Sequence, residues 1–369
     1  MKFDTTPFIA IWEVTQACKL ACVHCRAQAQ PLPLPGELTL AEGIDLIDQI
    51  AGLGTSVLVF TGGDPMTRID LLALIRHGKK RGLRVATIPA ATDRVTKGQI
   101  EALQEAGLTQ LAQSLDFSDE KRHDDFRQVP GTFQRTLRII AWAHEVGLPA
   151  QINTVFHGGN AGDLSRLAAL VKSLDVVFWE IFFLVPTGRG AAIPGLNAQQ
   201  VETIFQQIYA FSKTVKFFIK VTEAPHYNRY YLEQRLRETG HDPTAIARRG
   251  QLLPEELTAA LGPRGTIGRA PEAVNAGKGF VFISYDGDVF PSGFLPVAGG
   301  NIRKNSLADI YQKSPLFCDL RNPDLLGGQC GVCAYKRHCG GSRSRAFAIE
   351  GDWLAEDPWC IYATANAVA

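Results

Sequence analysis

Three cysteines near the N-terminus have a spacing that suits a metal or iron–sulfur site. Cys18, Cys22 and Cys25 form a C-x3-C-x2-C segment. Cysteine thiolates in short loops of this kind hold iron–sulfur clusters. Three thiolates are one short of saturating a four-iron cluster, so one iron would keep an open position for a small chelating ligand. The spacing alone also fits a zinc site completed by His24, or three free thiols.

Four more cysteines form a second group near the C-terminus. Cys330, Cys333, Cys339 and Cys360 are separated by two, five and twenty residues. Four thiolates can saturate either a tetrahedral zinc ion or a closed four-iron cluster, and the spacing fits both. The eighth cysteine, Cys318, stands apart, and we expect it to be a small buried hydrophobic residue.

The first cysteine segment resembles the signature of the radical S-adenosylmethionine (radical SAM) enzymes, C-x3-C-Φ-C, with His24 at the aromatic position Φ. The resemblance covers residues 8–190. Thr61–Pro65 (TGGDP) is similar to the family's GGE-type segment, with Asp in place of the usual Glu. The other similar segments are Ser114–Asp116 (S-x-D), Asn153–Val155 (T-T-V) and Pro186–Gly190 (P-x-G-R). Each segment alone is also typical of a strand end with a helix cap and no ligand.

This resemblance implies two cofactors, a [4Fe-4S] cluster and S-adenosylmethionine (AdoMet). It implies that the cluster is held by Cys18, Cys22 and Cys25. The AdoMet contacts that it implies are Gly62, Gly63, Asp64, Ser114, Asp116 and Asn153. The two glycines would let bare backbone approach the ligand closely. In the family, one electron from the cluster cleaves AdoMet to a 5′-deoxyadenosyl radical, which abstracts hydrogen without an acid–base pair, so no catalytic side chain is assigned.

The C-terminal region resembles the SPASM or twitch extensions of radical SAM enzymes, which implies a second, auxiliary [4Fe-4S] cluster on the four later cysteines. Cys339–Ala346, Ala355–Cys360 and Thr222–Tyr227 are similar to the subgroup that modifies tetrapyrroles in haem d1 synthesis and siroheme-dependent haem synthesis. Ser292 stands where many SPASM relatives carry a cysteine, so we expect a single auxiliary cluster.

The resemblance therefore implies an oxidoreductase or lyase that modifies a tetrapyrrole side chain. Arginine binds carboxylates through its bidentate fork. The candidate substrate contacts are Arg189, Arg229, Arg343 and Arg345. Two alternatives stay open: a SPASM-type maturase of a peptide or protein, and a non-enzymatic zinc-binding scaffold. The expected partners are AdoMet, a small-molecule or peptide substrate, and an electron donor such as flavodoxin or ferredoxin.

Short apolar runs alternate with helical patterns from Pro7 to Pro186, which favours a parallel sheet covered by helices. The predicted strands are Phe8–Val14, Val57–Phe60, Arg84–Ile88, Gln110–Leu115, Ala150–Phe156 and Val176–Leu184. The predicted helices between them are Leu40–Leu53, Ile69–Arg81, Thr96–Ala106, Phe133–Val146 and Asp163–Leu174. Periodicity permits a partial barrel or an open sheet. The resemblance selects an α/β fold with a partial (β/α)6 TIM-like barrel and a cysteine-rich C-terminal extension.

The pattern changes after Pro186. A helix over Ala198–Ser212 leads to a seventh strand, Lys216–Val221, and a further helix is expected near Tyr230–Glu238. Asp286-Gly287 between two apolar runs predicts a β-hairpin. We expect a radical SAM core at residues 1–220, a connecting region at 221–275 and an auxiliary-cluster domain at 276–369.

Composition excludes several classes of partner. The 369 residues include 38 Lys and Arg and 37 Asp and Glu, which gives a net charge of +1. This balance offers no electrostatic basis for binding nucleic acid or an anionic membrane surface. No apolar stretch is long enough to span a membrane, and the first residues do not resemble a signal peptide. We therefore expect a cytoplasmic protein, in which cysteines serve as metal ligands or free thiols rather than disulfides.

Overall fold

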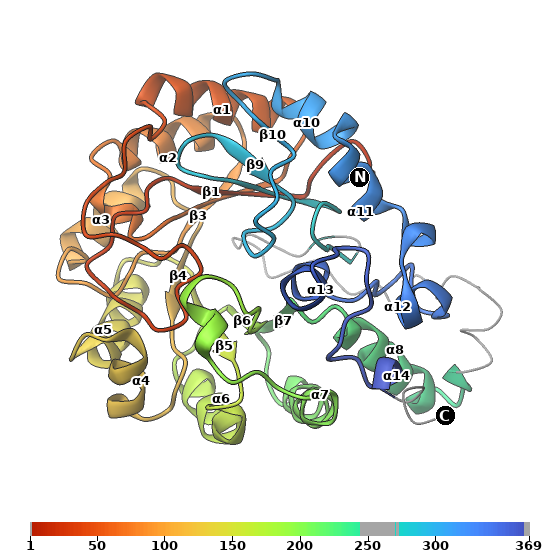
Figure 1. The fold of residues 1–369 in the computed structure, drawn as a ribbon. Helices are drawn as coiled ribbons and strands as arrows, with labels where there is room; N and C mark the ends of the chain where they lie inside the picture. The colour runs from red at the N-terminus through yellow and green to blue at the C-terminus, as the bar shows by residue number, and fades with distance from the viewer. Residues whose placement is uncertain (1, 244–269, 271–272, 365–369) are drawn as a thin grey trace.

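The computed structural model describes residues 2–243, 270 and 273–364. Its strands form one ten-stranded sheet in the order β10-β9-β8-β1-β2-β3-β4-β5-β6-β7. The strands are β1 (Ile9–Glu13), β2 (Val57–Thr61), β3 (Arg84–Thr87), β4 (Gln110–Ser114), β5 (Ala150–Phe156), β6 (Phe178–Phe183), β7 (Phe218–Thr222), β8 (Phe280–Ile283), β9 (Asp288–Phe290) and β10 (Gly300–Asn301). The sheet curves into a partial barrel that strand pairing does not close (Figure 1). The predicted partial barrel is confirmed.

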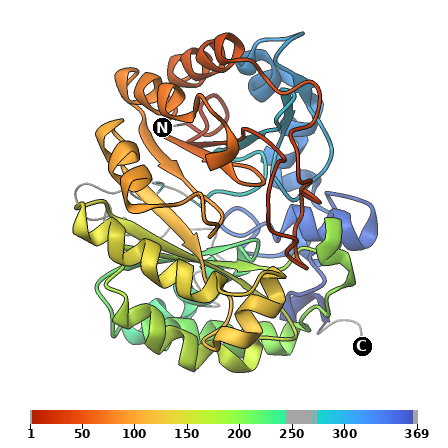
Figure 2. The ribbon, with the colours of Figure 1, turned by 90° about the vertical axis from the view of Figure 1, so that its left-hand side faces the viewer.

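All neighbouring pairs from β1 to β7 are parallel, as the alternation of strands and helices predicted. Helices α1 to α7 lie on the convex side of the sheet (Figures 1 and 2). The first eight helices are α1 (Leu40–Gly52), α2 (Leu71–Lys80), α3 (Lys97–Glu105), α4 (Glu120–Arg127), α5 (Thr132–Glu145), α6 (Leu164–Ser173), α7 (Ala198–Ser212) and α8 (His226–Glu238). Helix α4 was not predicted, because its charged sequence buries only His123 and Phe126.

The predicted hairpin is confirmed and has an additional role. β8 and β9 pair antiparallel around the turn that contains Gly287, whose φ of +90° suits glycine. β8 also pairs in parallel with β1, with Ile9 opposite Phe280. A segment from the C-terminal part of the chain therefore extends the same sheet that the N-terminal strands build.

The strands of the barrel separate two chemically different faces. On β6, Trp179 and Phe183 contact aromatic residues of α7, with Trp179 5.8 Å from Phe211 and Phe183 5.4 Å from Phe205 between ring centroids. Because side chains alternate along a strand, Glu180 and Phe182 face the opposite, concave side of the sheet. The apolar core thus lies between sheet and helices, while polar side chains occupy part of the concave face.

The remaining helices follow the hairpin and lie beside the open side of the barrel (Figure 1). They are α10 (Leu307–Lys313), α11 (Pro315–Arg321), α12 (Gly328–Val332), α13 (Arg343–Glu350) and α14 (Ile361–Thr364). Most of the predicted connecting region after residue 243 lies outside the described residues. None of the helices that the structure describes has both the length and the apolar composition to cross a membrane.

Candidate functional site

The loop after β1 brings the first three cysteines together. Cys18 and Cys22 are buried with Leu20 and Ala29, and Cys25 packs against this group. The loop is closed at its base, because the N–H of Cys18 donates to the carbonyl of Gln30 at 2.7 Å and the Gln30 N–H donates to Gln16 at 3.0 Å. The loop lies at the carboxyl end of the parallel strands, where barrels of this kind place their chemistry.

The surroundings of these thiols suit iron ligands. Backbone N–H groups donate to two of the sulfurs, Leu20 to Cys18 at 3.3 Å and Ala29 to Cys25 at 3.4 Å. Burial, with smaller contributions from the nearby Asp64 carboxylate and the other cysteine thiols, raises the pKa of Cys18 to about 12, although the Leu20 N–H opposes the shift. Buried thiols that raise one another's pKa need a cation to become thiolates, which iron supplies.

Arg127 of α4 provides a positive charge beside this group. Its guanidinium donates to Cys22 Sγ at 3.8 Å and forms a short ion pair with Asp116. Burial raises the pKa of Cys22, while Arg127 acts in the opposite direction and favours the thiolate. Asp116 is fully buried, and its other carboxylate oxygen accepts from the Val155 N–H at 2.9 Å. Asp116 therefore positions Arg127. The sequence contained Arg127 within the segment after S-x-D but gave it no role.

His24 belongs to an aromatic stack rather than to a ligand set. Its ring lies parallel to Phe126 at 4.3 Å, and Phe126 in turn stacks on His157 at 5.0 Å. Burial lowers the pKa of His24 to about 3, so the imidazole is neutral. A neutral flat ring can fill the aromatic position of the signature.

Both cysteine groups consist of thiols, which are the ligands that iron–sulfur clusters use. Four thiols also suit zinc, so the donor set of the second group fits either metal. Among residues 2–243, 270 and 273–364, no three His, Cys, Asp or Glu side chains stand in the arrangement of a metal-ion site.

Gly62 and Gly63 permit a close backbone approach, but to the cluster loop. A Cβ on Gly62 would lie 2.4 Å from the Thr15 carbonyl oxygen, and one on Gly63 would lie 2.4 Å from that of Ala17. The N–H groups of Gly63 and Asp64 donate to the same two carbonyls at 2.8 and 2.7 Å. We expected these glycines to allow close approach to a ligand. In the structure, they also allow the turn after β2 to contact the backbone of the cysteine loop.

Asp64 is also committed within the protein. Its carboxylate is fully buried and accepts from the Met66 N–H, the Ala90 N–H and the Thr92 hydroxyl at 3.1 to 3.3 Å. Burial raises its pKa, and these donors oppose that shift. The side chain thus fixes the segment after β3 beside the turn after β2.

Ser114 and Asn153 lie side by side, because Ser114, the last residue of β4, is the register partner of Asn153 in the middle of β5. Asn153 is buried, and its Oδ1 accepts from Gln151 Nε2 at 2.6 Å. Ser114 lines a small pocket next to the cysteine loop, together with Leu20, Pro89, Ala90, Ala91, His123, Arg127, Thr132 and Thr136. The structure therefore brings the S-x-D and N-T-V segments to one place beside the first three cysteines.

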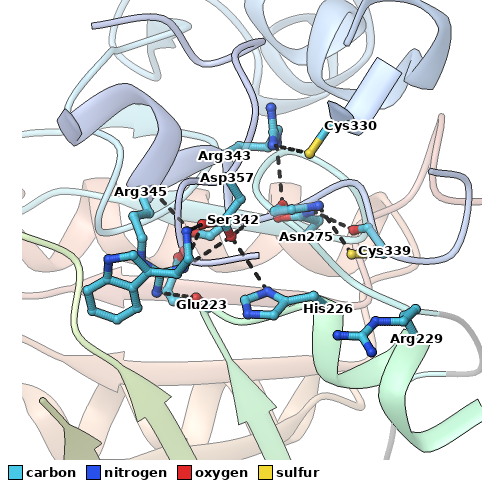
Figure 3. Close-up of polar contacts among 12 residues, drawn as sticks. Glu223, His226, Arg229, Asn275, Cys330, Cys339, Ser342, Arg343, Arg345 and Asp357 are labelled. Carbon is cyan, nitrogen blue, oxygen red and sulfur yellow. Dashed lines mark hydrogen bonds and ion pairs between the residues drawn. The ribbon is translucent and has the colours of Figure 1, made fainter. Parts of the chain in front are cut away.

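Two cysteines of the second group lie against α8, and Figure 3 shows a third, Cys330, beside Arg343. Cys333 and Cys339 pack on Leu232 and Leu236 of that helix. Backbone N–H groups again donate to sulfur, Tyr335 to Cys333 and Gly341 to Cys339, both at 3.4 Å.

The four thiols of this group influence one another. Burial, with a smaller contribution from the nearby Cys330 thiol, raises the pKa of Cys360 to about 11. Burial also raises the pKa of Cys339, with added contributions from Cys360 and Cys330. Cys333 is among the groups that raise the pKa of Cys330. The same combination of buried thiols and N–H···S contacts is found at both cysteine groups.

Three of the four candidate substrate arginines are buried among partners inside the protein. Arg345 is fully buried, pairs with Asp357 at 3.1 Å and lies 4.0 Å over the Trp359 ring. Arg229 is 4% exposed and pairs with Glu202. Both side chains are buried and form ion pairs within the protein, while the Nε atom of each has no hydrogen-bond partner among the described residues (Figure 3).

Arg343 has a different internal role. It is 1% exposed, donates to the carbonyls of Trp353 and Ala355 at 2.9 and 2.6 Å, and approaches Cys330 Sγ at 3.7 Å (Figure 3). Arg343 therefore places a positive charge beside the second cysteine group, as Arg127 does beside the first.

Arg189 is the candidate that stays beside the cysteine loop with donor capacity. Its Nε donates to the Cys22 carbonyl at 2.9 Å. Its Nη2 is buried and has no hydrogen-bond partner among the described residues. Gly188 brings this segment close, since a Cβ there would lie 2.4 Å from the Arg26 carbonyl oxygen. A buried donor without a partner is suited to an anionic group of a ligand.

One expectation about a single residue is wrong, and another residue has a contact that the sequence did not indicate. Cys318 is exposed, so the expected burial is wrong. Ser292 is buried and donates to Glu223 at 2.9 Å, so it has a structural role. Glu223 also accepts from Ser342 at 2.6 Å and Ser344 at 3.0 Å, an assembly of three hydroxyls that the sequence did not indicate.

Comparison with known proteins places these sites in a family. Residues 12–171 match the model of the radical SAM superfamily, and residues 275–339 match SPASM, an iron–sulfur cluster-binding domain. The chain is 38% identical to the AdoMet-dependent heme synthase of Methanosarcina barkeri, over 96% of this chain and 97% of that protein. It is 27% identical to the PqqA peptide cyclase of Methylocella silvestris, over 94% of this chain and 86% of that protein.

A solved structure shares the fold. The crystal structure of Streptococcus suis SuiB bound to S-adenosylmethionine superposes with a TM-score of 0.71 at 15% identity, covering 97% of this chain and 78% of that one. The radical SAM match implies a [4Fe-4S] cluster and AdoMet as cofactors, and the SPASM match implies auxiliary iron–sulfur binding. Together with the identity along nearly the whole chain, these matches show that the protein is an enzyme of the radical SAM family with a SPASM domain.

Proposed function

We propose that this enzyme modifies a carboxylated tetrapyrrole in haem-type biosynthesis. The observation that carries the proposal is the 38% identity, along nearly the entire chain, to a relative named AdoMet-dependent heme synthase. The relative named as a peptide cyclase is more distant, at 27% identity. When bound, the first cluster and AdoMet supply a 5′-deoxyadenosyl radical. The residues of this chain then have to bind, orient and shield the reactants.

The concave face offers surfaces that suit a flat, anionic ring. Phe182 of β6 and Phe294 after β9 are 6.1 Å apart between centroids. Arg26, directly after Cys25, lies 4.3 Å over the Phe282 ring and pairs with Glu13 at 3.2 Å. Aromatic rings and a guanidinium are the groups that contact planar carboxylated molecules. These groups are of the kinds that a planar, carboxylated substrate requires.

The assignment of cofactor ligands is part of the proposal. The ligands of the AdoMet-binding cluster would be Cys18, Cys22 and Cys25, and those of the auxiliary cluster Cys330, Cys333, Cys339 and Cys360. Ser114 and Asn153 would contact AdoMet directly. Gly62, Gly63, Asp64 and Asp116 would act mainly by shaping its pocket, since their contacts are within the protein. Arg189 would bind an anionic group of AdoMet or the substrate.

Further parts of the proposal concern the setting of the enzyme. We retain residues 1–220 as the radical SAM core, 221–275 as the connecting region and 276–369 as the auxiliary-cluster domain, with β8 joining the two outer parts. Eight free cysteines support a reducing, cytoplasmic location. An electron donor such as flavodoxin or ferredoxin would reduce the first cluster.

Turnover under strict anaerobiosis tests the function. Reconstituted enzyme, AdoMet and a chemical reductant would be incubated with carboxylated porphyrins, with and without iron, and separately with peptides. Mass spectrometry would follow 5′-deoxyadenosine and the product. A porphyrin that loses mass at a side chain in step with 5′-deoxyadenosine formation supports the proposal. Modification of a peptide, with porphyrins unchanged, would establish the maturase alternative instead.

A further inference from the structure

A half-buried carboxylate and a lysine, neither of them part of the cysteine groups, form a pair on the concave face. Glu180 of β6 and Lys220 of β7 are register partners on adjacent parallel strands. The Lys220 Nζ lies 2.7 Å from Glu180 Oε1. The side chain of Glu180 is 14% exposed and that of Lys220 is 30% exposed. The pair therefore lines the inside of the barrel, and the lysine is the more accessible member.

Glu180 is held from three directions. Its Oε1 also accepts from the Thr222 hydroxyl at 2.7 Å, and its Oε2 accepts from Gln151 Nε2 at 3.1 Å. Three donors on one carboxylate fix its position and delocalise its charge. Lys220, in contrast, donates a hydrogen bond to Glu180 among the described residues. An ammonium group has three N–H donors, so two of them remain available to a molecule inside the barrel.

The pair is connected to a proposed AdoMet contact. Gln151 Nε2 donates both to Glu180 and to Asn153 Oδ1, the latter at 2.6 Å. The orientation of this amide is set from the other side, because Gln151 Oε1 accepts from Gln110 Nε2 at 2.5 Å. The Gln151 side chain thus links Asn153 to Glu180, and Glu180 in turn holds Lys220. The position of Lys220 relative to Asn153 is therefore fixed.

We propose that Lys220 binds a carboxylate of the substrate and that Glu180 positions it for that contact. The inference rests on the proposed function and adds a specific residue to it. A lysine anchored by a fixed carboxylate presents its spare donors in one direction, which lowers the entropy lost on binding. The ligand class is an organic anion whose carboxylate extends from an apolar ring, because Phe182 lies on the same face of β6 two residues from Glu180.

Binding of a tetracarboxylate porphyrin to the reconstituted holoenzyme tests this inference. Coproporphyrin III and its tetramethyl ester have the same ring but differ in charge. Their dissociation constants would be measured anaerobically by quenching of protein fluorescence, with AdoMet present. The variants are Lys220→Met, Lys220→Gln, which keeps a neutral donor for Glu180, and Lys220→Arg, which keeps the charge. Lys172→Met, at an exposed position of α6, is the matched control.

Loss of one charge-assisted hydrogen bond predicts about ten- to hundredfold weaker binding of coproporphyrin III by Lys220→Met and Lys220→Gln. The ester should bind all variants alike, and Lys220→Arg should recover most of the affinity. Iron content and thermal midpoint establish that each variant is folded. Equal coproporphyrin affinity in wild type and Lys220→Gln would overturn the role of Lys220 while leaving the proposed function intact. A wild type that binds neither porphyrin would overturn both.

Discussion

Glu223 and Ser292 link the two ends of the sheet. Glu223 directly follows the edge strand β7, Ser292 follows β9 near the opposite edge, and the serine hydroxyl donates to Glu223 Oε1 at 2.9 Å. Ser342 and Ser344, at the start of α13, donate to the same carboxylate. The open side of the barrel is therefore joined by side chains where strands do not pair, and the residue that replaces a SPASM cysteine is one of the donors.

Removing this carboxylate should loosen the C-terminal region. Glu223→Ala leaves three hydroxyls without their acceptor, so we expect a loss of about 2 kcal/mol in unfolding free energy, against about 1 kcal/mol for Ser292→Ala. Urea denaturation of the reconstituted enzyme measures both. Hydrogen exchange should show the change in α13 and in the segment after β9. Equal stability of Glu223→Ala and wild type would show that these hydrogen bonds do not hold the region.

Gly63→Ala should damage the first cysteine loop. The added Cβ would lie 2.4 Å from the Ala17 carbonyl oxygen, so the backbone that leads to Cys18 has to move. We expect lower iron occupancy at that site together with weaker AdoMet binding. Gly98→Ala is the control, because a Cβ at this position of α3 meets nothing within 4 Å. Full iron content in Gly63→Ala with loss of AdoMet binding alone would restore direct ligand approach as the reason for this glycine.

Strands β1 to β5 could be predicted because each is a short, mostly buried run that contains apolar residues, a pattern that local sequence carries. The pairing of β8 with β1 could not be predicted, because the sequence of a hairpin does not indicate which distant strand it pairs with. The same limit applied to the arginines. Arg343 and Arg345 occupy a polar segment, S-R-S-R, that is typical of solvent. Only the packed structure shows their partners, which are carbonyls, Asp357 and the Trp359 ring.

Candidate site residues could be proposed from the sequence where a residue type is tied to one kind of chemistry. Cysteines at cluster spacing and the segments at strand ends could be identified because the carboxyl ends of parallel strands meet. Glu180, Lys220 and Arg127 were missed because isolated charged residues have no distinctive spacing. Their relation depends on strand register and on α4, which are set by contacts distant in sequence.

Acid should destabilise the folded protein through its buried histidines. Burial lowers the pKa of His226 to about 3, although Asp357 opposes the shift. An unfolded histidine titrates near 6.5, so between these pH values only the unfolded chain takes up the proton. Stability is then fully present above pH 6.5 and decreases as pH falls, by at most about 1.4 kcal/mol per pH unit for this residue.

His226→Gln should therefore show a shallower loss of stability between pH 7 and pH 5 than wild type, measured by urea midpoints. His144→Gln, at an exposed position of α5, should follow the wild-type slope. Other buried histidines with lowered pKa values, such as His24 and His123, also contribute to the loss of stability in acid, so some pH dependence remains in every variant. A His226→Gln slope equal to that of wild type would show that this imidazole is protonated in the folded protein.

Iron analysis should find about eight irons per chain after anaerobic reconstitution, as two four-iron clusters require. Replacing Cys18, Cys22 and Cys25 with Ala should reduce the iron content to about half and abolish AdoMet cleavage. Iron near half of the expected amount in well-reconstituted wild type, with zinc accounting for the difference, would contradict the auxiliary cluster.

The two cysteine groups should differ in role, and the variant Cys333→Ala/Cys339→Ala separates them. Four thiolates saturate the second cluster, so it has no open iron for AdoMet, whereas the first group leaves one. We expect the double variant to form 5′-deoxyadenosine but to give little product in the same anaerobic reaction.

Both cysteines also pack on Leu232 and Leu236, so α8 will lose contacts, and a thermal midpoint must accompany the assay. Cys318→Ala, at an exposed position outside both groups, controls for loss of a thiol as such. A folded double variant that makes product at the wild-type yield would show that the second cluster has no part in the chemistry. Loss of both 5′-deoxyadenosine and product, together with aggregation, would show that the cluster is structural.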